Sequence, residues 1–177
     1  DERDKEAALH AACMHDIIRG VGGQKPFMMM ESSPSAVNWH AVNTLRQPGV
    51  LMLQGLQAVA HGSDSVQYFQ FRKGRGSSEQ YHGAIVGHDN SDQTRIFKEV
   101  SEVGKALSQL SAVTGSAAES KIALLYDWDN YWILNEAQFG HNSGDKKYIE
   151  TVLNHYAAWK QIGFNVDMID QTCDLSS

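Results

Sequence analysis

The 177-residue sequence predicts an α/β protein built on a parallel β-sheet. Segments with apolar residues at helical spacing alternate along the chain with short apolar runs that are typical of buried strands. The expected order is a helix followed by a strand, repeated to the end of the chain, and a parallel sheet with crossover helices produces this order. A composition of 42% hydrophobic and 20% charged residues is that of a soluble globular protein with a core of its own.

The first half of the chain contains two predicted helix and strand pairs. Residues 1–19 place apolar side chains among charges at helical spacing, and glycines follow as stop signals. Residues 26–30, PFMMM, are an apolar run of the kind that forms a strand buried on both faces. Residues 48–62 predict a second helix, with Pro48 in its first turn and Gly62 at its end. Residues 65–71 are rich in Val, Tyr and Phe and predict the next strand.

The second half begins with a long Gly- and Ser-rich connection over residues 72–92. Long connections in compact proteins are often binding or active-site loops, and a purely structural linker is the alternative. A third helix is expected from Gln93, because apolar residues follow at steps of four and three: Ile96, Val100, Val103, Leu107 and Leu110. A strand over 121–128, a helix over 146–162 and a strand over 164–169 complete the predicted order. The small polar patch at 112–120 predicts a domain boundary, giving domains 1–112 and 113–177.

Charge and cysteine content exclude several function classes. The net charge of −6 disfavours nucleic acid and anionic membranes as partners, since both require clustered Lys and Arg. Cys13 and Cys173 lie near opposite ends and form neither a disulfide framework nor a zinc motif, so we expect no metal and no cofactor. No apolar stretch reaches the roughly 18 to 20 residues of a membrane span, and the acidic N-terminal segment is unlike a signal peptide. These observations predict a cytoplasmic protein.

The chemistry is expected at the carboxyl ends of the predicted strands, because crossover helices leave that edge of a parallel sheet open. Glu31 directly follows the first strand, where a carboxylate does not contribute to packing. The alternative to a catalytic role is a structural one, in which Glu31 caps a helix or loop or forms a salt bridge. No GxSxG motif is present to suggest a serine nucleophile, and Gly74 with Gly76 forms only a fragment of a nucleotide-binding motif.

Residues near the strand ends have the mixed chemistry of a sugar site. Trp39 and Phe69 offer apolar faces for stacking on a ring, and Asn38, Glu79 and His82 offer polar groups for its hydroxyls. A carboxylate nucleophile beside such a surface favours glycoside hydrolysis. For His82 alone, a structural or surface role is the simpler interpretation.

Three collinear segments resemble the β-galactosidases of glycoside hydrolase family 42: PFMMMESSPSAVNW, PGVLMLQGLQAVAHGSDSVQYFQFRKGRGSSEQYHGA and ALLYDWDNYW. The resemblance implies that residues 1–112 are the C-terminal part of a (β/α)8 barrel, with strands 7 and 8. It implies that residues 113–177 begin an α/β trimerisation domain, flavodoxin-like or amidotransferase-like, of a homotrimer. The substrates implied are terminal non-reducing β-D-galactosides.

The same resemblance implies roles for individual residues. Glu31 matches the nucleophile of a retaining, double-displacement mechanism, Trp39 matches a tryptophan of the galactose pocket, and Phe69, Glu79 and His82 match galactose contacts. The family's acid/base is a Glu of an Asn-Glu pair after the fourth barrel strand, which we expect outside this chain. Asn135 and Glu136 have that dipeptide but fall in the second predicted domain. We therefore expect this chain alone to be inactive; the alternative is an inert carbohydrate-binding or oligomerisation fragment.

Overall fold

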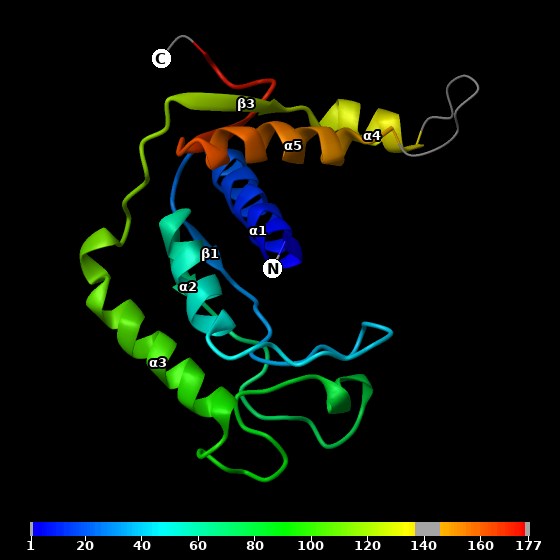
Figure 1. The fold of residues 1–177 in the computed structure, drawn as a ribbon, viewed down its shortest axis with the longest axis vertical. Helices are drawn as coiled ribbons and strands as arrows, with labels where there is room; N and C mark the ends of the chain where they lie inside the picture. The colour runs from blue at the N-terminus through cyan, green and yellow to red at the C-terminus, as the bar shows by residue number, and fades with distance from the viewer. Residues whose placement is uncertain (1, 137–145, 176–177) are drawn as a thin grey trace. The chain divides into compact units, whose positions relative to one another are not determined.

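The computed structural model describes residues 2–136 and 146–175, which form an α/β protein. The chain divides into two compact units, and each is described by itself (Figure 1). The central unit is Phe27–Ser116, and the terminal unit combines Asp1–Pro26 with Ala117–Ser177. Among the described residues, no helix is long and apolar enough to cross a membrane.

The central unit contains a pair of parallel strands, β1 (Phe27–Met29) and β2 (Ser63–Val66). Helix α2 (Val50–Ala60) connects them and packs on α3 (Arg95–Gln109), as Figure 1 shows. The predicted parallel pairing of the first two strands is confirmed. Two short 3-10 helices complete the unit, η1 (Ser78–Tyr81) and η2 (Ser111–Val113).

Local chemistry explains where the two long helices of this unit begin. Gly49 precedes α2 with φ of 83°, a left-handed conformation that favours glycine. Pro48 therefore lies outside the helix, and its predicted place in the first turn is wrong. Thr94 caps α3, because its Oγ1 accepts a hydrogen bond of 3.2 Å from the backbone N–H of Phe97.

Two details of the predicted strands differ in the structure. The second strand was expected at 65–71 but ends at Val66, because its partner β1 ends at Met29, the residue opposite Val66. The first strand was expected to be buried on both faces, yet Met28 is 55% and Met30 is 66% exposed. In the described part of the chain, β2 is the strand that pairs with β1, and the two-stranded sheet leaves these methionines uncovered.

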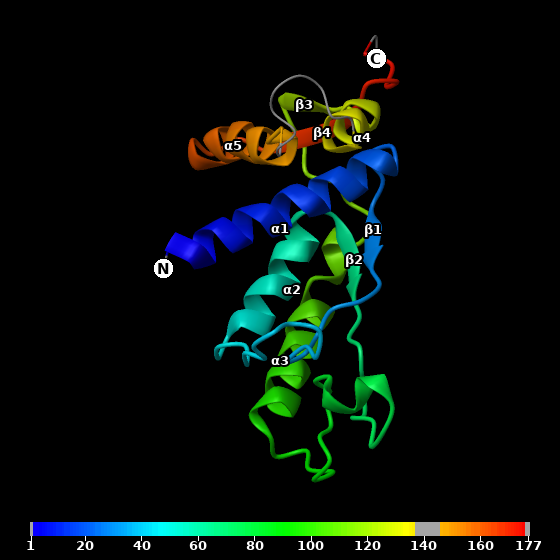
Figure 2. The same ribbon diagram turned by 90° about the vertical axis from the view of Figure 1, so that its right-hand side faces the viewer.

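The terminal unit contains the second parallel pair, β3 (Ile122–Tyr126) and β4 (Val166–Asp170), in continuous register from Ile122 opposite Val166. Helix α1 (Glu2–Val21) packs against β4 and α5 (Tyr148–Gln161), as Figure 2 shows.

Helix α4 (Trp128–Glu136) was not predicted. The sequence from Trp128 is rich in aromatic and β-branched residues, which favour strands. The predicted strand at 121–128 therefore included Trp128, the first residue of the helix. The signal that marks the helix start is Asp127, whose Oδ1 accepts a hydrogen bond of 2.9 Å from the backbone N–H of Asn130.

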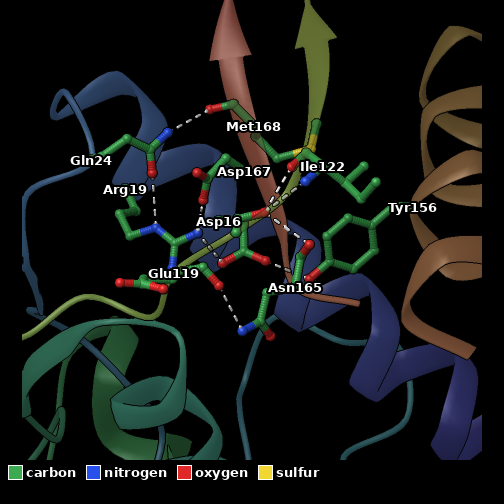
Figure 3. Close-up of polar contacts among 10 residues, drawn as sticks. Asp16, Arg19, Gln24, Glu119, Ile122, Tyr156, Asn165, Asp167 and Met168 are labelled. Atoms are coloured by element: carbon green, nitrogen blue, oxygen red, sulfur yellow. Dashed lines mark hydrogen bonds and ion pairs between the residues drawn. The ribbon is translucent and has the colours of Figure 1, made fainter. Parts of the chain in front are cut away.

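A buried network of charges lies between α1, β4 and α5 (Figure 3). Arg19 is 3% exposed and Asp16 is 1% exposed. Nη2 of Arg19 lies 2.7 Å from Oδ1 of Asp167 and 3.2 Å from Oδ1 of Asp16. The hydroxyl of Tyr156 donates to Oδ2 of Asp16. Each buried charge therefore has a partner of opposite charge, which burial of ionic groups requires.

Candidate functional site

The loops that follow β1 and β2 are held together by hydrogen bonds. The backbone N–H of Phe69 donates to the carbonyl of Ser32 at 3.0 Å, and that of Gly83 donates to the carbonyl of Ala36 at 2.8 Å. Both loops leave the carboxyl ends of the two parallel strands, where the site was expected. The backbone thus brings the segment after Glu31 beside the segment that carries Phe69.

Gly83 permits the closest contact between these loops. A Cβ atom at this position would lie 2.2 Å from Oγ of Ser35 and 2.6 Å from the carbonyl oxygen of Ala36. Neither distance is compatible with a side chain, so the approach of the two loops depends on glycine. The sequence analysis included Gly83 only as part of a matched segment and assigned it no role.

Glu31 lies just beyond the carboxyl end of β1, and its side chain is exposed. The next residue, Ser32, accepts the backbone hydrogen bond from Phe69. Glu31 is therefore at the strand end where it was predicted, next to a residue that contacts the second loop. Its carboxylate is available to an incoming molecule.

Phe69 and His82 form an edge-to-face pair with ring centroids 5.1 Å apart and planes inclined by 75°. His82 is buried, and its Nδ1 lies 2.9 Å from the carbonyl oxygen of Gly83. A carbonyl oxygen only accepts, so Nδ1 carries the hydrogen in this contact. The predicted role of His82 in recognition stays a prediction.

Glu79 is half-buried in the 3-10 helix η1 and is held on two sides. Nδ2 of Asn38 donates to its Oε2 at 3.2 Å and to the carbonyl of Ser78 at 2.6 Å. The backbone N–H of His82 donates to the Glu79 carbonyl at 3.1 Å. These hydrogen bonds connect Asn38 with Glu79 and His82 into one polar group, although Asn38 lies 41 positions before Glu79 in the sequence.

Trp39 follows Asn38 and is 70% exposed. Its ring lies against His40, with centroids 4.1 Å apart and planes inclined by 43°. The structure therefore places Trp39 in the same loop as the polar group, with a ring surface open to solvent. Its predicted role in stacking on a sugar stays a prediction.

Arg46 connects the first loop to both helices of the central unit, and the sequence analysis missed it. Its Nε donates to the carbonyl of Ser33 at 3.0 Å and its Nη1 donates to Oε1 of Gln54 on α2 at 2.8 Å. Nη2 of Arg95 on α3 donates to the Arg46 carbonyl at 2.8 Å. Burial lowers the pKa of the Arg46 guanidinium, and nearby Tyr68 opposes this shift. No sequence motif marks these contacts, because the partners of Arg46 are the Ser33 carbonyl and the side chains of Gln54 and Arg95 on two different helices.

Two other expectations concern groups outside these loops. Asn135 and Glu136 lie at the end of α4 in the terminal unit, whereas Glu31 lies in the central unit. Within residues 2–136 and 146–175, no group of three or more His, Cys, Asp or Glu side chains is placed to hold a metal ion.

Comparisons with known proteins match both parts of the chain. A family profile described as β-galactosidase, of glycoside hydrolase family 42, matches residues 1–110. A second profile, described as the β-galactosidase trimerisation domain, matches residues 120–177.

Individual relatives agree with these profiles. β-Galactosidase Pbg of Clostridium perfringens is 51% identical over 99% of this chain and 25% of its own length. β-Galactosidase GalA of Bacillus licheniformis is 47% identical over 99% of this chain and 26% of its own length. The chain thus spans about a quarter of the length of the curated relatives that it matches.

Solved structures give the same result. A catalytic glutamate-to-alanine mutant of Gan42B, a family 42 β-galactosidase from G. stearothermophilus, is 44% identical, with a TM-score of 0.91 over 96% of this chain and 24% of that one. The cold-adapted β-galactosidase from Rahnella sp. R3 is 47% identical, with a TM-score of 0.90 over 96% of this chain and 25% of that one.

Proposed function

Because the chain belongs to the β-galactosidases of glycoside hydrolase family 42, we propose that its full-length parent is a retaining β-galactosidase with Glu31 as the nucleophile. The observation that carries the proposal is the position of Glu31, exposed at the carboxyl end of β1 beside the loop that holds Phe69, Glu79 and His82. The catalytic glutamate named for Gan42B supports carboxylate chemistry in a relative. The alternative of an inert binding or oligomerisation fragment is not favoured by these matches.

The reaction proposed is a double displacement. A carboxylate oxygen of Glu31 attacks the anomeric carbon, the bond to the leaving oxygen breaks, and a second carboxylic acid gives that oxygen its proton. The second carboxylate then takes a proton from water, whose oxygen attacks the anomeric carbon and releases galactose and the Glu31 carboxylate. Two inversions restore the β configuration. We place the second carboxyl group in the part of the parent protein outside this chain.

Recognition of the galactose ring is assigned to the residues that the two loops bring together. Nε2 of His82 and the carboxylate of Glu79 bind ring hydroxyls, while Phe69 and the exposed face of Trp39 contact its C–H surface. Asn38 orients Glu79 by donating to its Oε2 at 3.2 Å. Because these residues are assigned to the hydroxyls and the C–H surface of the ring, Glu31 is the group assigned to the anomeric carbon.

The architecture proposed for the parent follows the family. Residues 1–112 supply strands 7 and 8 of a (β/α)8 barrel, with β1 and β2 as those strands, and residues 113–177 begin a flavodoxin-like trimerisation domain. The partners proposed are a terminal β-D-galactoside and two further copies of the parent. The parallel pairing within each unit supports this assignment, since both of these architectures contain parallel strands.

Chemical rescue tests the nucleophile in the full-length parent. Glu31→Ala removes the attacking carboxylate, so turnover of an aryl β-galactoside is expected to fall by several orders of magnitude. Added azide is expected to restore reaction and to yield an α-galactosyl azide, because a single displacement inverts the anomeric carbon. Glu102→Ala, at an exposed position on α3, serves as the control for expression and folding. A Glu31→Ala enzyme with wild-type turnover, or rescue that yields the β-azide, would show that another residue attacks.

A further inference from the structure

Helix α1 has different neighbours in the sequence and in the structure. The β-galactosidase profile matches it as part of residues 1–110. In the structure, however, α1 belongs to the terminal unit together with Ala117–Ser177, which contains the whole segment that the trimerisation profile matches. The boundary between the two compact units therefore does not coincide with the boundary between the two profiles.

Apolar packing ties α1 to this unit. Three residues of α1 are buried in the same core as residues of β3, α5 and β4: Ala12, Cys13 and Ile17 with Tyr126, Tyr156, Val166 and Met168. In the described part of the chain, α1 covers apolar side chains of β4 and α5. Since apolar burial is the main force that stabilises a small domain, this packing holds α1 in the terminal unit.

The polar network in Figure 3 makes the contact specific. Arg19 of α1 pairs with Asp167 of β4 at 2.7 Å, and Asp16 of α1 accepts from Tyr156 of α5 at 2.5 Å. Removing one member of a buried ionic network leaves its partners charged and uncompensated. A displaced or differently registered α1 would leave these groups unpaired, so the network selects one position of the helix.

The turn after α1 is fixed to β4 as well. A Cβ atom at Gly20 would lie 1.8 Å from the carbonyl oxygen of Met168, so the backbones touch here. Gln24 accepts from Nε of Arg19 at 3.0 Å and donates to the same Met168 carbonyl at 3.4 Å. Strand β1 starts at Phe27, three positions after Gln24, and Glu31 follows that strand.

We infer that α1 and the turn through Gln24 are the element that couples the trimerisation segment to the segment carrying Glu31. The surface made by β4 and α5 is the docking site for α1, and Arg19 is the positioning residue at its centre. The consequence for Glu31 rests on the proposed function; the docking of α1 does not. Because only Lys25 and Pro26 separate Gln24 from β1, a change in the docking of α1 acts through the chain on the start of the strand that Glu31 follows.

Hydrogen exchange on the full-length protein tests the docking. In Arg19→Gln, amides of α1 and β4 are expected to exchange faster together, on the order of 100-fold, because one cooperative unit loses a buried ion pair. Amides of α2 and α3 keep wild-type protection. Tyr156→Phe, which loses a bond between α5 and α1, gives a smaller change in those two helices, and Lys147→Gln, from an exposed ion pair with Glu150, gives none. Faster exchange confined to α1 or to β4 alone, or spread equally over α2 and α3, would overturn the docking.

Steady-state kinetics on the same variants test the coupling to Glu31. Arg19→Gln is expected to lower kcat at least about tenfold with little change in KM, since small displacements of a reacting group slow the chemical step more than binding. Arg19→Lys, which keeps the charge, recovers part of kcat. Wild-type kcat in a variant that has lost protection in α1 and β4 would overturn the coupling. If instead Glu31→Ala retained turnover, the proposed function would fail while the exchange result stood.

Discussion

The hydroxyl of Tyr156 on α5 donates a hydrogen bond of 2.5 Å to Oδ2 of Asp16 on α1, which lies 140 positions earlier in the chain. Both side chains are buried. Burial raises the pKa of Tyr156, and the charge of Asp16 raises it further, so the hydroxyl keeps its hydrogen wherever the protein is folded. Deprotonation of the hydroxyl at neutral pH therefore does not break this bond between α1 and α5.

Tyr156→Phe removes this donor without opening a large cavity. The variant is expected to lose about 1.5 to 3 kcal/mol of unfolding free energy, because the hydrogen bond is made to a charged group that stays buried. Urea unfolding of the full-length protein, followed in the terminal unit, measures the loss. Lys147→Gln is the control and is expected to change stability by less than about 1 kcal/mol, as for exposed ion pairs. Equal stability of Tyr156→Phe and the wild type would contradict the role given to this bond.

The Cys13 thiol makes stability sensitive to alkaline pH. Burial raises the pKa of Cys13 from 9.0 to about 12, with the charge of Asp16 as the second cause. A raised folded-state pKa contributes stability that is fully present below pH 9 and is lost as the pH rises towards 12. The unfolding free energy should therefore fall over this window, and less steeply in Cys13→Ala. A thiol reagent at pH 8 should label exposed Cys173 and leave Cys13 unmodified until the protein unfolds. Labelling of native Cys13 at the rate of Cys173 would be inconsistent with its burial.

Gly83→Ala is expected to separate the two loops of the site. Its Cβ atom would lie 2.2 Å from Oγ of Ser35 and 2.6 Å from the carbonyl oxygen of Ala36, so the backbone must move. Turnover of a β-galactoside by the parent should fall at least about tenfold, because the groups on the two loops no longer converge. Gly76→Ala, in the same loop, meets no atom within 4 Å and is the matched control. Similar kinetics of the two variants would argue that the loop contact is not needed.

Arg46 is expected to act on Glu31 through the Ser33 carbonyl. Arg46→Met removes the donors to Ser33 and Gln54 while keeping most of the apolar stem, so the loop loses its attachment to α2. We expect kcat of the parent to fall about tenfold and Arg46→Lys to recover only part of it, since lysine cannot make both bonds in the same geometry. Gln54→Leu should reproduce part of the defect, and the double variant should lose less than the sum. Strict additivity of the two changes would show that they do not act through one contact.

Much of the fold could be predicted because its patterns are local. Apolar spacing identified α1, α2, α3 and α5, and short apolar runs identified β1, β3 and β4 within a few residues. The start of β2 and the whole of α4 were missed, since Ser63 and Asp64 have low strand propensity and Trp128, Tyr131 and Ile133 do not have a helical signature. The predicted burial of Met28 and Met30 was wrong, because the burial of a side chain depends on neighbouring elements that the sequence of one strand does not specify.

The position of Glu31 directly after a strand could be predicted from the sequence. The pairing of β1 with β2 places its loop beside the one that carries Phe69, a residue that the sequence analysis had assigned to the second strand itself. Arg46 and Gly83 act through backbone carbonyls, so their partners have no side-chain signature in the sequence. The same is true of Arg19, whose partner Asp167 lies 148 positions away and is paired with it only by the fold.

Covalent trapping tests the assignment of Glu31 most directly. An activated 2-deoxy-2-fluoro-β-galactoside slows the second displacement more than the first, so the galactosyl ester accumulates on the nucleophile. Digestion of the inactivated full-length protein and mass spectrometry should find the sugar on the peptide that contains Glu31, with stoichiometric loss of activity. A label on any other carboxylate, or complete inactivation with an unmodified Glu31 peptide, would contradict Glu31 as the nucleophile.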